Sequence, residues 1–341
     1  MNTNLKYGSY GYAFEVRELE KGEYPEWDSF VDKSPQGTVF HKASWLDSDE
    51  DYEFKILACM HKGNIVAGMP LPYIRRYGVK LGTHPFLTEY LGVLFRESNQ
   101  KYNTRLSFER ELSKALAKTV KNFAPYIKYA FHSNFVDPLP FVYTGLSVRT
   151  NFHYVLSLEG DLDAILNGME KDTRNRIVRS LKNDLEFSDS SKEMAELICL
   201  SYKRKNQRPP LSREVYARHL DALSKTKAVR SIVAKDGDDL LAGGTIAYDS
   251  KSAYYILGGF NSDKHKGVGP LVIWKLIRHA KEVLGLREFD FGNPPLNENT
   301  ERFYRGFGGK LTHNYVVYKS NMLYYLMRAW VKMNWKVRAT F

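Results

Sequence analysis

A short glycine-containing loop in the C-terminal half of the chain has the residues of an anion-binding site. The apolar run 253–260 predicts a buried strand, residues 264–269 read Lys-His-Lys-Gly-Val-Gly, and an amphipathic helix is predicted over 271–284. Glycine lets the backbone approach a ligand closely, and the N–H groups that begin a helix attract negative charge. This chemistry suits a pyrophosphate, although a solvated turn that caps the helix would have the same sequence. The candidate ligand-binding residues are Lys264, Lys266, Gly267, Val268 and Gly269.

A second group of residues with catalytic chemistry follows in the next predicted strand, residues 287–292. Asp290 lies near the end of this strand, where ligands bind in open α/β sheets, and is a candidate base; alternatively, it caps the following turn. A short helix and turn are predicted over 297–309, with Tyr304 as a candidate proton donor. Tyr304 could equally be a packing residue under the turn, because the chain has 23 tyrosines.

The composition is that of a basic protein with enough residues for two domains. The chain has 341 residues and a formal net charge of +11, which favours anionic partners such as a nucleotide cofactor, a phosphorylated substrate, RNA or a membrane surface. Cys59 and Cys199 lie in apolar segments, so we expect a reduced, cytoplasmic protein without a disulfide framework. No apolar run reaches the roughly 18 residues of a spanning helix, and no residues have metal-ligand spacing.

An internal repeat relates the two halves of the chain. Residues 63–73, Gly-Asn-Ile-Val-Ala-Gly-Met-Pro-Leu-Pro-Tyr, align with residues 238–248, Asp-Asp-Leu-Leu-Ala-Gly-Gly-Thr-Ile-Ala-Tyr, and each segment lies in a predicted hairpin. We infer an α/β fold of two tandem units, over 1–145 and 146–320. Only the second has the glycine loop, since 85–92 stands at the corresponding place in the first. We therefore expect the second unit to bind the cofactor and the first to shape an acceptor site.

A helical insertion over 162–224 separates the two hairpins. It begins with one predicted helix over 162–183 that has a basic face, and further helices are predicted over 194–205 and 213–224. Guanidinium groups bind phosphate and carboxylate well, although a solvated basic face is the alternative interpretation. The candidate substrate-binding residues are Arg174, Arg176 and, in the strand 253–260, Tyr255.

These motifs together resemble the GNAT acyltransferase superfamily and, within it, the Fem-like and BioF2-like group of double-GNAT proteins. In that superfamily Arg/Gln-x-x-Gly-x-Gly/Ala holds the pyrophosphate of CoA, and here Lys264 takes the first position. An asparagine also precedes the tyrosine-bearing helix in that superfamily, so the resemblance implies that Asn299, or alternatively Asn297, binds the cofactor. The segments Lys171-Asp-Thr-Arg-Asn-Arg-Ile-Val-Arg179, Phe289-Asp-Phe-Gly292 and Phe303-Tyr-Arg-Gly-Phe-Gly-Gly309 are similar to motifs of the Fem-like group, which includes the peptidoglycan interpeptide-bridge aminoacyltransferases. Tyr304 stands where that group usually has lysine, which favours a thioester donor over aminoacyl-tRNA.

The resemblance implies a mixed-sheet α/β fold of tandem GNAT-like domains and direct acyl transfer, without a nucleophilic cysteine or serine. The first hypothesis is an N-acyltransferase that moves an acyl group from acyl-CoA, such as acetyl-CoA, to an amine of a small molecule or a cell-envelope precursor. The second is an aminoacyl-tRNA-dependent aminoacyltransferase that builds peptidoglycan interpeptide bridges. A third hypothesis, based on the charge of +11, is a non-catalytic protein that binds RNA or an anionic polymer.

The last stretch of the chain, 321–341, combines apolar residues at helical spacing with Arg328 and Arg338. An amphipathic helix that packs on the protein is one interpretation. Peripheral contact of a basic, aromatic helix with an anionic membrane is the other, and it would suit a lipid-linked envelope precursor as the acceptor.

Overall fold

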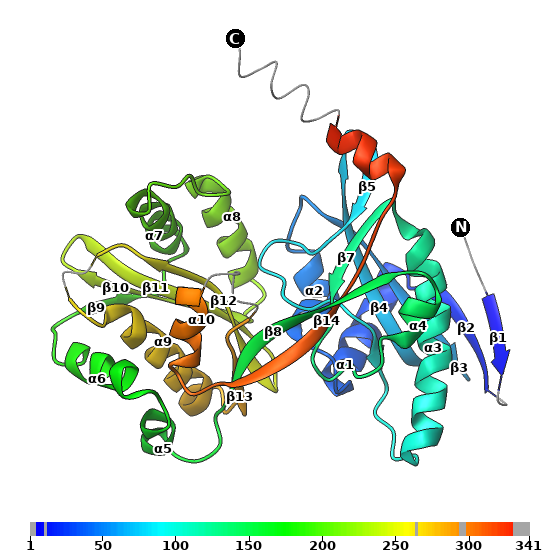
Figure 1. Cartoon of the computed structure of the whole chain (residues 1–341), viewed down its shortest axis with the longest axis horizontal. Helices are drawn as coiled ribbons and strands as arrows, with labels where there is room; N and C mark the ends of the chain where they lie inside the picture. Colours follow the sequence, from blue (N-terminus) through cyan, green and yellow to red (C-terminus); the bar gives the residue numbers. More distant parts are fainter. Residues whose placement is uncertain (1–4, 10–11, 263–264, 293–297, 330–341) are drawn as a thin grey trace, which may run out of the picture. The chain divides into compact units, whose positions relative to one another are not determined.

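The computed structural model describes residues 5–9, 12–262, 265–292 and 298–329 of the chain. The chain forms two compact units (Figure 1): the N-terminal unit, residues 1–151 with 313–341, and the C-terminal unit, residues 152–312. Two long strands, β8 (Ser147–Ser157) and β14 (Lys310–Ser320), have residues in both units. No helix among the described residues is both long and apolar enough to span a membrane.

The N-terminal unit is built on one mixed sheet. Its remaining strands are β1 (Leu5–Ser9), β2 (Tyr12–Glu18), β3 (Glu53–His61), β4 (Asn64–Arg76), β5 (Val79–Gly82), β6 (Leu94–Phe95) and β7 (Tyr126–Ala130). Its helices are η1 (Lys21–Glu23), α1 (Tyr24–Lys33), η2 (Val39–His41), α2 (Ala43–Leu46), α3 (Tyr102–Phe123) and α4 (Leu139–Tyr143). The order is β1-β2-β3-β4-β5-β7-β14, β6 pairs with β4, and the β5–β7 pair is parallel.

Helices cover both faces of this sheet, and successive strand residues point alternately to one face and the other. Along β3, Ile56 and Ala58 belong to the buried cluster around α1, whereas Leu57 and Cys59 belong to the larger cluster that contains the apolar face of α3. Gly68 of β4 faces α1, since a Cβ atom at this position would lie 2.5 Å from the ring of Trp27.

The C-terminal unit repeats this plan. Its strands are β9 (Glu186–Ser188), β10 (Val229–Asp236), β11 (Asp239–Tyr248), β12 (Ser252–Phe260) and β13 (Glu288–Asp290), in the order β8-β13-β12-β11-β10-β9. Its helices are α5 (Leu162–Asn167), α6 (Lys171–Ser180), α7 (Ser191–Arg204), α8 (Arg213–Ser224), α9 (Val268–Arg278), which continues as the π-helical turn η3 (His279–Val283), and α10 (Glu298–Arg305). The β12–β13 pair is parallel.

Neighbouring glycines of β11 show that α7 and α9 lie on opposite faces of this sheet (Figure 1). A Cβ atom on Gly243 would lie 2.7 Å from the side chain of Leu197 in α7, whereas one on Gly244 would lie 2.9 Å from the side chain of Leu276 in α9. Successive strand residues point to opposite faces, so each helix takes the space of one missing side chain.

The internal repeat is visible as a shared irregularity in the two hairpins. The β3–β4 pairing skips Val66, and the β10–β11 pairing skips Leu241, which is the aligned position. Each β-bulge is followed by the same Ala-Gly pair, whose glycine faces the helix α1 or α7. The predicted α/β fold of tandem units is confirmed by this architecture.

Some predicted elements differ in extent. The single helix predicted over 162–183 is wrong: it breaks into α5 and α6 at Gly168–Glu170, where the chain turns to pack against the segment after α10. The strand predicted over 287–292 is shorter, since Asp290 ends it by capping a turn. In the C-terminal segment, residues 322–329 are helical, with Leu323 and Leu326 about half exposed, and 330–341 lie outside the described residues.

Candidate active site

The parting of β12 and β13 is the feature of the C-terminal unit best suited to hold an extended ligand. The strands pair in parallel up to Tyr254–Asp290, whereas β12 continues to Phe260 along β11. The β11 pairing skips Ile256, so a β-bulge twists β12 at the place where β13 leaves it. No other strand in the described parts of the chain pairs with this edge of β12, so its backbone N–H and C=O groups can bind a ligand.

The corresponding strands of the N-terminal unit also part, but there the chain itself fills the edge. β5 and β7 pair up to Gly82–Ile127. Beyond this pair the N–H of Ala130 donates to Nε2 of His84 at 2.8 Å, and the N–H of Leu91 donates to the carbonyl of Ala130 at 2.6 Å. The edge of β7 is therefore satisfied internally.

The comparison of units corrects one prediction. Phe95 of β6 pairs with Ala67 as Phe260 of β12 pairs with the aligned Ala242. The segment that corresponds to the glycine loop is therefore 96–101, which leads into α3, and not 85–92. It reads Arg-Glu-Ser-Asn-Gln-Lys, so the first unit has no glycine loop at this place either.

Tyr304 of α10 packs against both strands at the point where they part. Its ring stacks on that of Phe291, the residue after β13, with centroids 5.5 Å apart and planes inclined by 28°. Its other neighbour is Tyr255 of β12, whose ring stands edge-on at 6.0 Å and 82°. The structure thus brings two predicted site residues, Tyr255 and Tyr304, into direct ring contact. Phe291, on which Tyr304 also stacks, was not predicted as a site residue.

Two glycines make room for the ring of Tyr255. A Cβ atom on Gly258 would lie 1.9 Å from the hydroxyl oxygen of Tyr255, and one on Gly244 would lie 2.9 Å from its ring. Burial, and secondarily the neighbouring Tyr304, raise the pKa of Tyr255 well above its ordinary value. The Tyr255 hydroxyl therefore keeps its proton at neutral pH and can donate a hydrogen bond.

Asp290 has the turn-capping contact that the sequence analysis gave as an alternative. Its Oδ1 accepts the N–H of Gly292 at 2.8 Å, and its Oδ2 lies 3.9 Å from Nε2 of the buried His153. The residue is 4% exposed. These contacts favour a role in holding the end of β13 over a role as a general base.

The glycine loop lies against α6. Gly267 is buried, has φ +101° and precedes the first residue of α9. A Cβ atom at this position would lie 2.4 Å from the carbonyl oxygen of Arg176.

The other predicted residues of this loop differ in what they can offer a ligand. Val268 is fully buried in the core, so only its backbone can meet a ligand. Gly269 is open, since a Cβ atom would make only ordinary contact with Phe260 at 3.6 Å. Lys266 is exposed, and Lys264 lies outside the described residues.

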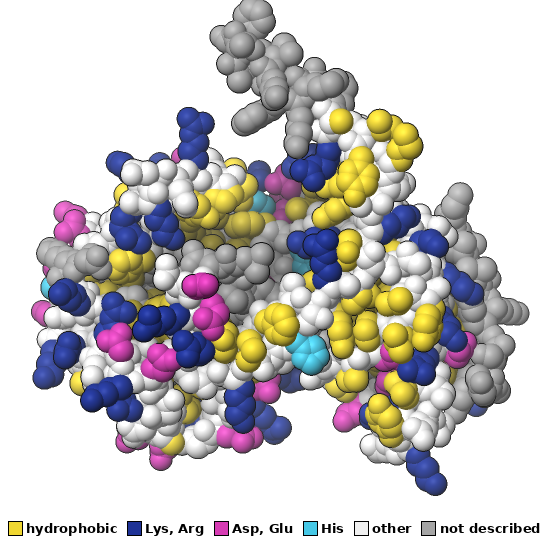
Figure 2. Space-filling model, viewed as in Figure 1, with side chains coloured by type: hydrophobic (Ala, Val, Ile, Leu, Met, Phe, Trp, Pro, Cys, Tyr) yellow, Lys and Arg dark blue, Asp and Glu magenta, His cyan; other side chains and the backbone are white. Residues whose placement is uncertain are grey.

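The two candidate arginines of α6 have partners within the protein. Arg174 donates to the carbonyl of Asn167 at 3.0 Å, which holds the end of α5, and Arg176 lies 4.0 Å from Asp172. Acidic and basic side chains are interspersed over α6 and α10 (Figure 2), where Arg305 also approaches Glu170 at 3.3 Å. The structure therefore favours the interpretation of a solvated basic face.

The sequence analysis missed that the segments 168–173 and 303–309, which it treated separately, contact each other. The N–H of Glu170 donates to the carbonyl of Gly306 at 2.9 Å. A Cβ atom on Gly306 would lie 2.5 Å from Oγ1 of Thr173, and one on Gly308 would lie 2.8 Å from the carbonyl of Gly168. These glycines let the turn that follows Tyr304 dock against the beginning of α6.

Glu301 is a titratable residue of α10 that the sequence analysis also missed. It accepts a hydrogen bond from the hydroxyl of Tyr154, which raises the pKa of Tyr154, and it lies 3.4 Å from Arg305. Its spacing of three residues from Tyr304 was the available signal, because residues three apart share a helix face. Asn299 is an exposed residue in the first turn of the same helix.

Comparisons with known proteins agree with this architecture. Residues 170–303 match the family described as acetyltransferase (GNAT) domain. The fold is similar to that of FemX (TM-score 0.64, 14% identity, 88% of this chain and 96% of the other). It also resembles a tandem GNAT protein from the clavulanic acid biosynthesis pathway (TM-score 0.51, 11% identity, 89% and 97%).

A third similar structure is the C-terminal domain of an Agrobacterium fabrum protein assigned as a lysylphosphatidylglycerol synthetase (TM-score 0.53, 14% identity, 92% and 97%). A comparison with curated proteins found no match. At these identities the structural matches show the fold, and the family match covers the segment from the start of α6 into α10. Residues 170–303 of this chain thus match the acetyltransferase (GNAT) domain family, within a fold similar to those of FemX and a tandem GNAT protein.

Proposed function

We propose that the protein is an N-acyltransferase that uses acyl-CoA as donor and an amine as acceptor. The observation that carries this proposal is the placement of Tyr304 against Phe291 and Tyr255, where β12 and β13 part. A strand edge with which no described strand pairs, a β-bulge and a phenol meet at this one place. The N-terminal unit lacks the free edge because His84 and Leu91 fill it.

The donor supplies a thioester, whose carbonyl carbon is attacked by the neutral amine while the thiolate leaves. The edge of β12 beyond the bulge offers backbone N–H groups for the carbonyl oxygen, which becomes negatively charged during the reaction. The Tyr304 hydroxyl gives its proton to the leaving sulfur. The proton lost by the amine passes to solvent or to a carboxylate, and Glu301 is a carboxylate one turn before Tyr304 on the same helix.

The loop before α9 would hold the pyrophosphate of CoA through backbone N–H groups, with Lys266 adding positive charge. Gly269 is the glycine whose open side leaves room for this approach. The acceptor is an amine-bearing small molecule or a cell-envelope precursor, and the N-terminal unit would shape its site. The formal net charge of +11 is consistent with an anionic acceptor or with peripheral contact with an anionic membrane.

One observation favours a second candidate, an aminoacyl-tRNA-dependent aminoacyltransferase. The backbone of Arg176 occupies the side of Gly267 on which a pyrophosphate could otherwise approach. The fold similarity to FemX is compatible with both candidates, since at 14% identity it concerns the fold alone.

The test is an assay for release of free CoA thiol from acetyl-CoA, with a panel of primary amines as acceptors. We expect thiol release that depends on both the enzyme and an amine, and that survives treatment with ribonuclease. Activity that requires charged tRNA and leaves acetyl-CoA intact would replace the first candidate by the second.

A further inference from the structure

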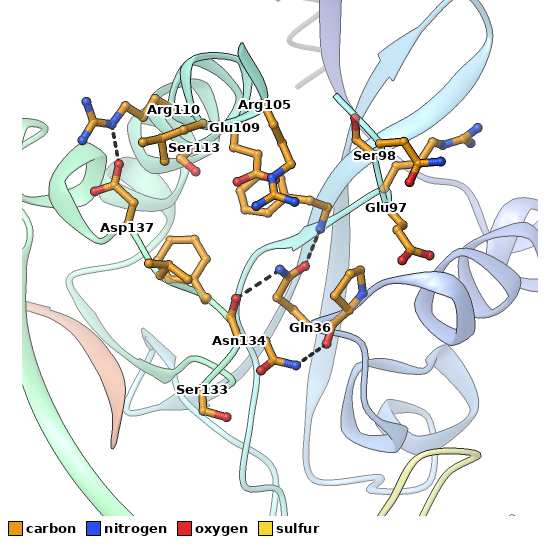
Figure 3. Close-up of a pocket in the computed structure, with 17 residues that line it drawn as sticks. Gln36, Glu97, Ser98, Arg105, Glu109, Arg110, Ser113, Ser133, Asn134 and Asp137 are labelled. Atoms are coloured by element: carbon orange, nitrogen blue, oxygen red, sulfur yellow. Dashed lines mark hydrogen bonds and ion pairs between the residues drawn. The ribbon is translucent and has the colours of Figure 1, made fainter. Parts of the chain in front are cut away.

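One cavity of the N-terminal unit has no role in the proposed acyl transfer. It has a volume of about 510 Å³ and lies beyond the ends of β6 and β7, beside one face of α3 (Figure 3). Because β6 corresponds to the end of β12, and α3 to α9, the cavity takes the place in the first unit that the glycine loop takes in the second. Open α/β sheets bind ligands at such strand ends.

The base of this cavity is preorganised. The side-chain amide of Gln36, which is 8% exposed, donates to the carbonyl of Asn134 at 3.2 Å and accepts the N–H of Phe95 at 3.1 Å. Phe95 and Phe135 stack beside it with centroids 6.1 Å apart and planes inclined by 16°. The cavity therefore combines an aromatic floor with a backbone that is fixed on two sides.

Three polar side chains on one face of α3, those of Arg105, Glu109 and Ser113, line the cavity (Figure 3). Nε of Arg105 lies 3.6 Å from the Glu109 carboxylate, and neither side chain has a hydrogen bond to another described residue. Ser113, one turn further along, is 2% exposed, and its hydroxyl also has no hydrogen-bond partner in the described chain. Burial raises the pKa of Glu109, which shows that its charge is poorly solvated. By contrast, Arg110 at the rim is already paired with Asp137.

The charges determine which ligand suits this site. A simple anion would meet the carboxylates of Glu97 and Glu109, and a simple cation would meet Arg96 and Arg105. A ligand that carries both charges can satisfy Arg105 and Glu109 together. Since these two groups are neighbours, the ligand's own charges must be neighbours, as the ammonium and carboxylate of an α-amino acid are.

We propose that this cavity binds a free α-amino acid with an apolar side chain. The carboxylate is held by Arg105, the ammonium group by Glu109 with Ser113, and the side chain lies on Phe95 and Phe135. This site is separate from the acyl-donor site in the C-terminal unit, and the proposal does not depend on acyl-CoA chemistry.

The test is calorimetric titration of the full chain with three compounds that share a carbon skeleton: L-leucine, 4-methylpentanoate, which lacks the ammonium group, and 3-methylbutylamine, which lacks the carboxylate. We expect leucine to bind with Kd below about 1 mM, and each analogue at least about tenfold more weakly. Absence of leucine binding up to about 10 mM, or equal binding of either analogue, would overturn the proposal.

Matched variants then locate the site. Arg105→Gln and Glu109→Gln should each weaken leucine binding at least about tenfold. Lys118→Gln is the matched control for Arg105→Gln, because it also removes one positive charge from α3 but lies outside this cavity. It should leave leucine binding unchanged. Leucine binding that survives both cavity variants would place the site elsewhere. If either variant fails to fold by thermal melt, the three-compound series on the natural chain still decides the proposal.

Discussion

A Cβ atom at position 267 would lie 2.4 Å from the carbonyl oxygen of Arg176. Gly267 therefore has two structural reasons to be glycine, its φ of +101° and the close backbone of α6. A substitution here disturbs the packing of α6 before any ligand is bound. Gly269, two residues later, has neither constraint, so it is the position at which ligand approach can be tested by itself.

Replacement of Gly267 by alanine is expected to reduce the free energy of unfolding by at least about 2 kcal/mol, because strain and a backbone clash add. Gly237→Ala is the matched control, since Gly237 also has a positive φ but has no atom within 4 Å of its Cβ position. Chemical denaturation gives the free energy of unfolding of both variants, and the difference between their losses is the contribution of the clash with Arg176. Equal losses of stability would show that the backbone of Arg176 moves aside without cost.

Tyr304→Phe keeps the ring that packs on Phe291 and Tyr255 and removes only the hydroxyl. We expect kcat to fall by about 100-fold or more, while donor affinity and the melting temperature change little, because general acid catalysis contributes this much. Steady-state kinetics and a thermal melt measure both effects. An unchanged kcat would restrict Tyr304 to packing.

The contact between Gly306 and Thr173 predicts that a substitution of one residue can compensate for the stability lost by a substitution of the other. Gly306→Ala should destabilise the protein by about 1–3 kcal/mol, since its Cβ would lie 2.5 Å from Oγ1 of Thr173. Thr173→Ala removes that oxygen and should recover most of the loss in the double variant. A double-mutant cycle with chemical denaturation measures the coupling, and additive effects of the two substitutions would count against this packing.

The partly buried imidazole of His84 predicts loss of stability in acid. Burial lowers the pKa of His84 to about 4, and both ring nitrogens are bonded in the neutral form, to the carbonyl of Thr88 and the N–H of Ala130. The unfolded chain binds the proton near pH 6.5, so stability is intact above that pH and falls as the pH drops towards 4. The loss should reach about 3 kcal/mol at most.

Denaturation curves at pH 7, 5 and 4 measure this dependence, and comparison with His84→Gln assigns it. The variant keeps a side-chain acceptor but does not titrate, so its curves should show a smaller change with pH. An identical pH dependence in the variant would mean that other groups are responsible.

The sequence predicted the tandem fold because the aligned hairpins share a local pattern, Ala-Gly followed by an aliphatic residue and then by Tyr73 or Tyr248. It also indicated Tyr304 and Tyr255, which the fold brings to ring contact. The break at Gly168–Glu170 was not predictable from helical periodicity, since it depends on the distant Gly306. In the same way, the partners of Arg174 and Arg176 arise from tertiary contacts that a basic helix face does not disclose.

The most direct test of the proposed donor site is calorimetric titration of acetyl-CoA into the natural chain and the Gly269→Val variant. The open side of Gly269 accepts a side chain without a clash, so the melting temperature should change little. The added side chain should obstruct the pyrophosphate. We therefore expect acetyl-CoA to bind the natural chain and to bind the variant at least about tenfold more weakly, roughly 1.4 kcal/mol. Equal affinity in both proteins, or no binding of acetyl-CoA to the natural chain, would contradict a donor site at this loop.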